Sequence, residues 1–354
     1  MADDLRIDSH KLIYHPERIA EWLQKGDVYP LTIEISPSGA CNYRCVFCAF
    51  DYLNYVPELL ERDLMIRLLD ESHENGVKSV VVCGEGEPLI NKHTPDIINY
   101  ARGIGMDVGM ASNGVLFTPE VAQYCLKSLT WIRISLNAGS DENHQKIHKS
   151  KRGDYAKILN NLRYAVEVKK RNGLTATIGV QLLLIPDNFH EAYSLAVQLK
   201  EIGVDYFTVK PYSQHPQSGS RIDEGFDYSA FLVMEEKLNQ LSTADYSIIF
   251  RSASMKKLNQ QRQYQHCWGL PFWAYIDAKA NVYACISYVG DDRFCYGNLK
   301  ENGFRELWQG EKRRMVIEHV ARMDLDGCRE LCRLDEINRY LQQIKYPSGH
   351  VNFI

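Results

Sequence analysis

Three cysteines lie close together at Cys41, Cys45 and Cys48, in the spacing C-x3-C-x2-C. They follow a run rich in β-branched residues, so we expect them on the loop after a strand. Three thiolates on one loop can bind three corners of a four-iron cluster and leave the fourth iron open, whereas structural clusters and zinc sites normally take four protein ligands. A zinc site that borrows a distant fourth ligand is the alternative. The spacing therefore favours an iron-sulfur cluster with one exchangeable coordination position.

This C-x3-C-x-aromatic-C loop after the first strand of a β-α barrel resembles that of the radical S-adenosylmethionine (SAM) enzymes. The resemblance covers most of the chain. It implies that the three cysteines hold a [4Fe-4S] cluster, that SAM chelates the open iron, and that Phe47 lies against the adenine. It also implies that reduction of the cluster cleaves SAM and gives a 5'-deoxyadenosyl radical, which abstracts hydrogen from an unactivated carbon.

A second motif resembles the Gly-Gly-Glu-Pro segment in which this family receives the methionine ammonium. Here Gly86, Glu87 and Pro88 match, while Glu85 replaces the first glycine and leaves an additional carboxylate near the site. A turn alone would also explain Gly-x-Gly-x-Pro. Its place one strand after the cysteine loop favours the cofactor-binding interpretation.

Weaker matches to the family follow at the ends of later strands. Asn113, in Ser-Asn-Gly, resembles the Thr-Asn-Gly turn after the third strand. Ser135 and Asn137 stand where polar residues often meet the ribose or the methionine carboxylate. Each of the three would serve equally well as a capping or turn residue.

Four further cysteines near the C-terminus, Cys267, Cys285, Cys328 and Cys332, resemble the twitch or SPASM extension of radical SAM enzymes. Full SPASM domains bind two auxiliary clusters with at least seven cysteines, and this region has five. The resemblance therefore implies one auxiliary [4Fe-4S] cluster on these four, with a structural zinc ribbon as the alternative. The fifth, Cys295, is then a substitute ligand, a hydrogen-atom donor or a buried small hydrophobe.

The candidate bases on the substrate side are Lys210 and His215, which follow the sixth expected strand, together with Glu85. Ligands of barrel enzymes gather at the carboxyl ends of the strands, which is where these residues fall. A solvated lysine or a hydrogen-bonded core histidine is the plainer interpretation of each.

Runs of β-branched residues alternate with segments of helical period between Leu31 and about Ser213, as in repeated β-α units. Six strands are too few for a closed eight-stranded barrel, so we predict an α/β fold built on an open, partial (β/α)6 TIM-like barrel. The expected strands are 31–36, 79–84, 107–112, 131–136, 176–183 and 206–210.

We divide the chain into an N-terminal extension (1–30), a radical SAM barrel (31–240) and a small α+β iron-sulfur domain of the twitch/SPASM type (241–354). The last part is expected to contain a hairpin, with strands at 272–277 and 281–286, and a helix over 304–319.

The composition is that of a folded protein: 354 residues, 24% charged and 45% hydrophobic, with a formal net charge of -4. It excludes a disordered or collagen-like chain and argues against a strongly basic nucleic-acid binder or a polybasic membrane anchor. The sequence has neither an apolar stretch of about 18 residues nor a signal peptide. We therefore expect a cytoplasmic protein, whose thiols are more often metal ligands or reactive groups than disulfides.

A second, fully ligated cluster can accept an electron from a substrate radical, an arrangement that resembles radical SAM dehydrogenases and sulfatase-maturing enzymes. The leading hypothesis is therefore the two-electron oxidation of a secondary alcohol in a sugar, cyclitol or nucleotide sugar, with flavodoxin or ferredoxin as the electron donor by resemblance. Alternatives are an epimerase that uses Cys295 or Cys83 as hydrogen-atom donor, a ribosomal-peptide-modifying enzyme, and a non-catalytic iron-sulfur electron carrier. About 30 residues precede the first strand, which is short for a peptide-recognition domain.

Overall fold

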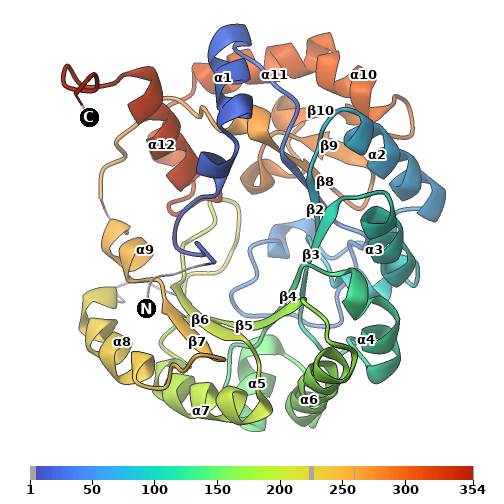
Figure 1. The fold of residues 1–354 in the computed structure, drawn as a ribbon, viewed down its shortest axis with the longest axis vertical. Helices are drawn as coiled ribbons and strands as arrows, with labels where there is room; N and C mark the ends of the chain where they lie inside the picture. Colours follow the sequence, from blue (N-terminus) through green and yellow to red (C-terminus); the bar gives the residue numbers. More distant parts are fainter. Residues whose placement is uncertain (1–4, 223–226, 259, 354) are drawn as a thin grey trace.

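One sheet runs through the whole molecule in the computed structural model, which describes residues 5–222, 227–258 and 260–353 (Figure 1). Its strand order is β10-β9-β8-β1-β2-β3-β4-β5-β6-β7. The strands are β1 (Thr32–Ile35), β2 (Ser79–Val82), β3 (Asp107–Ser112), β4 (Trp131–Ser135), β5 (Thr177–Leu184), β6 (Tyr206–Pro211), β7 (Ser247–Phe250), β8 (Trp273–Ile276), β9 (Asn281–Tyr283) and β10 (Cys295–Asn298).

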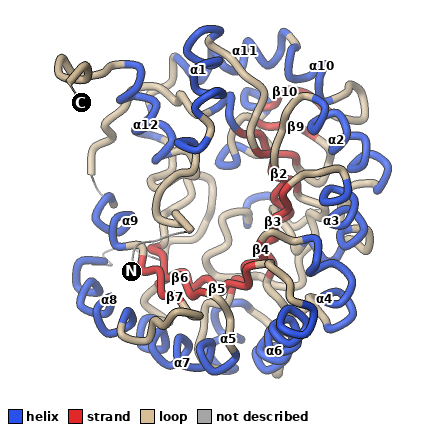
Figure 2. The backbone as a smooth tube through the Cα atoms, in the orientation of Figure 1, coloured by secondary structure: helices blue, strands red, loops and turns tan. Residues whose placement is uncertain are grey.

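The six expected strands form the parallel series β1 to β6, and the barrel is open because β10 and β7 are its two edges. Two further strands extend this series. β7 pairs in parallel with β6, and β8, expected only as a hairpin strand, also pairs in parallel with β1. The parallel sheet therefore continues beyond the division expected at residue 240, and it joins the C-terminal region directly to the barrel (Figure 2).

Helices cover the outer face of the sheet and alternate with its strands (Figure 1). They are α2 (Arg62–Glu74), α3 (Thr94–Gly103), α4 (Pro119–Cys125), α5 (Asp141–His148), α6 (Asp154–Asn172) and α7 (Ala192–Ile202), followed by α8 (Leu232–Asn239) and α9 (Ser252–Lys257). In α6, buried Tyr155, Ile158 and Leu162 recur at helical spacing, which places its apolar stripe on the sheet. One continuous apolar core joins the barrel to the hairpin region.

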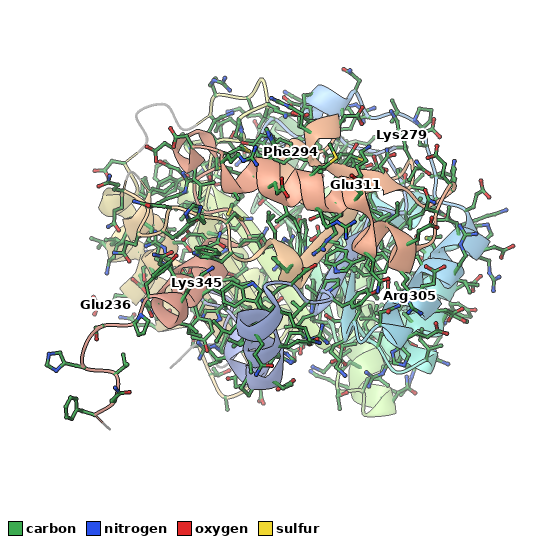
Figure 3. All side chains as sticks on the ribbon, turned by 90° about the horizontal axis from the view of Figure 1, so that it is seen from above. Glu236, Lys279, Phe294, Arg305, Glu311 and Lys345 are labelled. Carbon is green, nitrogen blue, oxygen red and sulfur yellow. The ribbon has the colours of Figure 1, made fainter. Side chains whose placement is uncertain are left out.

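The C-terminal region adds α10 (Phe304–Gln309), α11 (Glu311–Ala321) and α12 (Asp335–Lys345). The single helix expected over 304–319 is two helices, because Gly310 between them is extended (φ -69°, ψ 159°). Phe294 lies beside α11, where its ring meets His319 edge-on at 5.6 Å (Figure 3). None of the described helices combines the length and the hydropathy that a membrane crossing requires.

The N-terminal segment packs on α12. Its helix α1 (Pro16–Lys25) contributes buried Trp22 to a small apolar cluster that also contains Phe272 and Leu341. Residues ahead of α1 reach the amino-terminal ends of the strands, where they line a cavity of about 490 Å³ at the floor of the barrel.

Candidate active site

The loop after β1 carries Cys41, Cys45 and Cys48, and its backbone is fixed from two sides. The end of α5 holds one side, since Arg44 N donates to His148 O (3.1 Å) and Val46 N donates to Ile147 O (2.9 Å). The loop after β6 holds the other, where the Ser220 hydroxyl donates to Val46 O (2.8 Å). The three thiols therefore share one half-buried loop at the carboxyl ends of the strands, where functional groups of barrel enzymes gather.

His148 contacts this loop through its ring, a contact that the sequence analysis did not predict. The backbone N–H of Asn137 donates to Nε2 (3.2 Å), so the neutral ring carries its proton on Nδ1. Nδ1 lies 3.2 Å from the sulfur of Cys45, to which it can donate. His144 lies one helical turn earlier with its ring 4.5 Å away. Two histidines at i and i+4 were the available signal, because that spacing puts both on one face of a helix.

The segment after β2 packs its backbone against the cysteine loop. At Gly86 a Cβ atom would lie 2.2 Å from Ala40 O and 2.4 Å from Ser38 O, so only glycine fits there. At Gly84, with φ of +145°, a Cβ would overlap the Ser36 hydroxyl at 2.1 Å. The glycines of this motif therefore permit a close approach between two loops.

Glu87 ties the end of β2 to the end of β3. Its Oε1 accepts from the Ser112 hydroxyl (2.8 Å) and from Leu89 N (3.2 Å), and its Oε2 accepts from Asn113 N (2.8 Å). Burial raises the pKa of Glu87 to about 7. A carboxylate has about four acceptor positions, so one remains for a further donor. An ammonium group placed there would favour the ionised form.

The weaker candidates for cofactor binding lie around the same strand ends. Their side chains differ in how far hydrogen bonds and burial restrain them. The Asn113 amide donates to Asn42 Oδ1 (2.8 Å) on the cysteine loop. Asn137 is buried, and its Oδ1 accepts from Leu183 N (2.6 Å), so its side chain links β4 to β5. Ser135 ends β4, while Phe47 is half-buried with its ring edge-on to His148 at 5.6 Å. Pro88 is buried directly after Glu87.

The four C-terminal thiols expected to act together do line one pocket, at Cys267, Cys285, Cys328 and Cys332. The exposed surface of the pocket is largely apolar, and Tyr288 and Asn338 contact two of its thiols. The Asn338 amide donates to the sulfur of Cys267 (3.5 Å), and the Tyr288 hydroxyl lies 3.7 Å from the sulfur of Cys328. These hydrogen bonds to thiols are of the kind that surrounds iron-sulfur clusters.

The donor chemistry of both sets of thiols suits iron-sulfur clusters. Within the described ranges, no three His, Cys, Asp or Glu side chains converge on a point where one ion could bind. A zinc site needs its sulfurs about 2.3 Å from one ion, whereas a [4Fe-4S] cluster distributes its ligands over separate irons. Burial raises the pKa of Cys41 and of Cys285 to about 11, so metal binding must displace protons from these thiols.

Glu85 connects the barrel to the hairpin and also lines a cavity with Phe50 and Tyr55 from the segment after β1. Its Oε2 accepts from the Tyr275 hydroxyl and its Oε1 accepts from Ala278 N (2.9 Å). The side chain is buried, and burial raises its pKa. With both oxygens bonded to β8 and the turn after it, Glu85 acts as a tie between the two parts of the sheet.

His215 and Lys210 lie near the end of β6, and they differ in whether they can donate or accept a proton. Nδ1 of His215 accepts from Gln217 N (3.2 Å), so the neutral ring carries its proton on Nε2, which is buried with no hydrogen-bond partner among the described residues. Burial lowers the pKa of His215 to about 4. Burial and nearby arginines hold the pKa of Lys210 well below its usual range. His215 is therefore a hydrogen-bond donor, whereas the Lys210 amine can accept a proton.

The two remaining candidate thiols lie in separate places. Cys295 is buried on β10 with its sulfur 3.6 Å from Gly297 O, and it does not line the pocket of the four C-terminal thiols. Cys83 follows β2, and its thiol donates to Glu34 Oε1 (2.7 Å). Glu34 in turn pairs with Arg333 (2.7 Å), which comes from the C-terminal segment.

Two family models match the chain. The radical SAM superfamily model matches residues 35–196, and the model of the SPASM iron-sulfur cluster-binding domain matches residues 267–333.

Curated relatives are distant. The AdoMet-dependent heme synthase of Methanosarcina barkeri is 22% identical over 300 residues, which cover 79% of this chain and 82% of that protein. The S-adenosylmethionine-dependent nucleotide dehydratase of Lacinutrix mariniflava is 30% identical over 115 residues, which cover 31% of this chain and 24% of that protein.

Solved structures share the fold of this chain. Streptococcus suis SuiB bound to precursor peptide SuiA has a TM-score of 0.68 at 17% identity, over 95% of this chain and 78% of SuiB. Native anSMEcpe with bound AdoMet has a TM-score of 0.59 at 16% identity, over 89% of this chain and 95% of anSMEcpe.

Proposed function

We propose, from the premise that this chain is a radical SAM enzyme with a C-terminal SPASM domain, that it oxidises a secondary alcohol of a sugar, cyclitol or nucleotide sugar. The observation that carries the proposal is the position of the four-thiol pocket. Trp273 and Arg333 line both that pocket and the cavity at the floor of the barrel. A site with four thiol ligands therefore adjoins the floor of the barrel, on the opposite side of the interior from the strand ends that carry Lys210 and the cysteine loop.

When bound, SAM and its cluster supply a radical that removes a hydrogen atom from the substrate carbon, and an auxiliary cluster supplies an acceptor for one electron. Conversion of an alcohol to a ketone also releases the hydroxyl proton, which a residue of this chain must accept. Lys210 suits that role because its lowered pKa leaves a neutral amine at the carboxyl end of β6. His215 suits the orientation of a substrate oxygen, since its unpartnered Nε2 carries a proton.

The experiment is an anaerobic assay of the reduced protein with a panel of sugars, cyclitols and nucleotide sugars. We expect methionine, 5'-deoxyadenosine and one ketone product in equal amounts. Lys210→Met should lower ketone formation at least a hundredfold, in the range of general base catalysis. Lys200→Met is the matched control, since Lys200 is exposed on α7. SAM cleavage without any ketone would contradict the proposal.

A second candidate function, epimerisation, is favoured by the position of Cys83. Its thiol is half-buried after the end of β2 beside Glu34, and burial raises its pKa, which keeps the S–H intact. A thiol in that state can donate a hydrogen atom to a substrate radical. Deuterium transfer from heavy water to a redox-neutral product, lost in Cys83→Ser, would establish this function in place of oxidation.

A further inference from the structure

Four arginines from distant parts of the chain meet around the end of β6. Arg251 N donates to Val209 O (2.9 Å), next to Lys210, and Arg329 donates through NH2 to Ser213 O (2.9 Å). Arg133 comes from β4, and Arg333 from the C-terminal segment reaches Glu34 on β1 (2.7 Å). All four lie close enough to Lys210 to lower its pKa. Around Lys210, these four arginines therefore outnumber the two carboxylates with which they pair.

Only two of these arginines have a carboxylate partner. Arg251 pairs with Asp8 (2.9 Å), and Arg333 pairs with Glu34. Among the described residues, Arg133 and Arg329 pair with no carboxylate. Arg329 lies near Cys332, whose ligation as a thiolate would compensate part of its charge. No candidate cluster ligand compensates Arg133.

Arg133 is the least satisfied of the four. It alternates along β4 with buried Ile132 and Ile134, so its side chain lies on the inner face of the sheet. Its guanidinium lies over the Trp131 ring at 5.4 Å, and its Nε is buried without a hydrogen-bond partner. A guanidinium nitrogen buried without a partner among the described residues costs folding free energy, and arginine stays charged in proteins. A ligand that brings negative charge would remove that cost.

Space for such a ligand lies at the floor of the barrel. The 490 Å³ cavity is within the usual size range of ligand pockets. Of the four arginines only Arg333 is among its described lining residues, while Arg133 lies over the ring of Trp131, which also lines the cavity. Arg6, Lys11 and Lys78 add positive charge, and Asp107 is the only acidic residue among the described lining residues. Positive charge therefore extends from the level of Lys210 down to the floor.

We propose that these arginines bind a phosphate or diphosphate group of the substrate, so that the substrate is a phosphorylated or nucleotide-activated sugar or cyclitol. This inference rests on the proposed function and specifies its substrate class. The planar fork of arginine matches phosphate oxygens in pairs. Two guanidiniums without carboxylate partners among the described residues suit a multiply charged group better than a single carboxylate.

The register of the sheet gives the orientation of such a substrate. Arg133 pairs with Gly179 on β5, and Lys210 pairs with Leu183, four residues further along the same strand. At roughly 3.3 Å per residue, Lys210 lies about 13 Å closer to the carboxyl ends of the strands. The anionic group therefore binds deep in the barrel, and the reacting carbon lies at the level of Lys210 and the cysteine loop. A bound anion would also raise the proton affinity of Lys210, which the arginines suppress.

The test measures binding of inorganic pyrophosphate, phosphate and succinate to the reconstituted holoprotein by calorimetry, with SAM binding and the melting temperature measured in parallel. We expect wild type to bind pyrophosphate more tightly than phosphate and to bind succinate weakly. Arg133→Met should weaken pyrophosphate binding at least tenfold and raise the melting temperature of the ligand-free protein, because it removes a half-buried cation that has no carboxylate partner among the described residues. Arg133→Lys keeps the positive charge but loses the planar guanidinium. Its pyrophosphate affinity should lie between those of wild type and Arg133→Met. Arg163→Met, on the exposed face of α6, is the control.

Equal pyrophosphate affinity in wild type and Arg133→Met would overturn the proposal, as would tight binding of succinate. A parallel loss of SAM affinity would also overturn it, because the arginines would then serve the cofactor's carboxylate. If Arg133→Met does not fold, Arg133→Lys provides the same comparison. Failure of the anion site alone would leave SAM cleavage and alcohol oxidation intact, whereas intact pyrophosphate binding without oxidation would contradict the proposed function only.

Discussion

The two groups of thiols are built in opposite ways. Cys41, Cys45 and Cys48 share one short loop that neighbouring backbone holds in place. The other four come from separate segments, around the β8–β9 hairpin and ahead of α12, and meet only because the chain folds them together. The first group has three thiols on the loop and the second has four in one pocket, which is the difference between a cluster open to a cofactor and one closed by protein. The contrast teaches that local spacing specifies an exchangeable site, whereas a closed site depends on the whole fold.

The largest expected effect is on the local site. Replacement of Cys41, Cys45 and Cys48 together by alanine should abolish SAM cleavage, because no other group in the described chain provides those ligands on one loop. The measurement is 5'-deoxyadenosine released by the reduced protein. Cys125→Ala, which changes a buried thiol on α4, should keep this activity. Retained SAM cleavage in the triple variant would contradict the assignment of the cofactor-binding cluster to the three thiols of the loop.

Removal of the distributed site should separate cofactor chemistry from substrate oxidation. In Cys285→Ala we expect SAM cleavage to persist while ketone formation falls to background, since the electron acceptor is lost. We also expect a lower melting temperature, because a cluster there links segments that are far apart in the sequence. Unchanged ketone formation would assign the tail a purely structural role, as a zinc ribbon would have.

The pH dependence of ketone formation should report the protonation state of Lys210. Only the neutral amine accepts a proton, so the rate of ketone formation should fall as the pH drops through the pKa of Lys210, which burial and the arginines place well below 10.5. Lys210→Met should remove this limb of the pH profile as well as most of the rate. A profile that keeps its acidic limb in the variant would point to another base.

A smaller effect is expected from His148. Because its Nδ1 donates to the sulfur of Cys45, His148→Leu should lower the midpoint potential of the cluster on the cysteine loop. A tenfold change in a one-electron equilibrium corresponds to about 60 mV, which is the expected scale. His144→Leu is the matched control, since its Nδ1 faces Ser150 instead. Potentiometric EPR titration measures the midpoint potential of wild type, His148→Leu and His144→Leu. Equal potentials in these three proteins would exclude the hydrogen bond from His148 to Cys45.

The smallest effect concerns the tie between barrel and hairpin. Tyr275→Phe removes the hydroxyl that donates to Glu85 and leaves a buried oxygen without that donor. We expect a loss of about 1–3 kcal/mol of unfolding free energy, measured by denaturant unfolding, without loss of iron. A drop in iron content would mean that this tie also positions the pocket of the four C-terminal thiols.

What could be predicted from the sequence follows the same contrast. The cysteine loop, the Glu87 motif and six strands were predicted, because each depends on spacing within a short segment. β7 was missed because four residues, Ser247-Ile-Ile-Phe, gain their place only by pairing with β6. The prediction of a single helix over 304–319 was wrong in one detail, because Gly310 divides that segment into two helices.

The side chains of the barrel interior were also missed, since their convergence depends on register rather than on spacing. Arg133 between Ile132 and Ile134 was the available signal, because a charge on the inner face of a buried strand needs a partner. Glu85 shows a related limit. Its place in the motif predicts a group near the substrate, which stays a prediction, and only the position of the hairpin reveals its hydrogen bonds to Tyr275 and Ala278.

The measurement that tests the account most directly is anaerobic analysis of iron, sulfide and zinc with EPR, before and after addition of SAM. It compares wild type with the Cys41, Cys45 and Cys48 triple alanine variant. We predict about eight irons in wild type and about four in the variant, no zinc, and a SAM-dependent change in the EPR signal of wild type only. About four irons in wild type falling to near zero in the variant, or zinc retained in both proteins, would contradict the presence of an auxiliary cluster and with it the proposed oxidation.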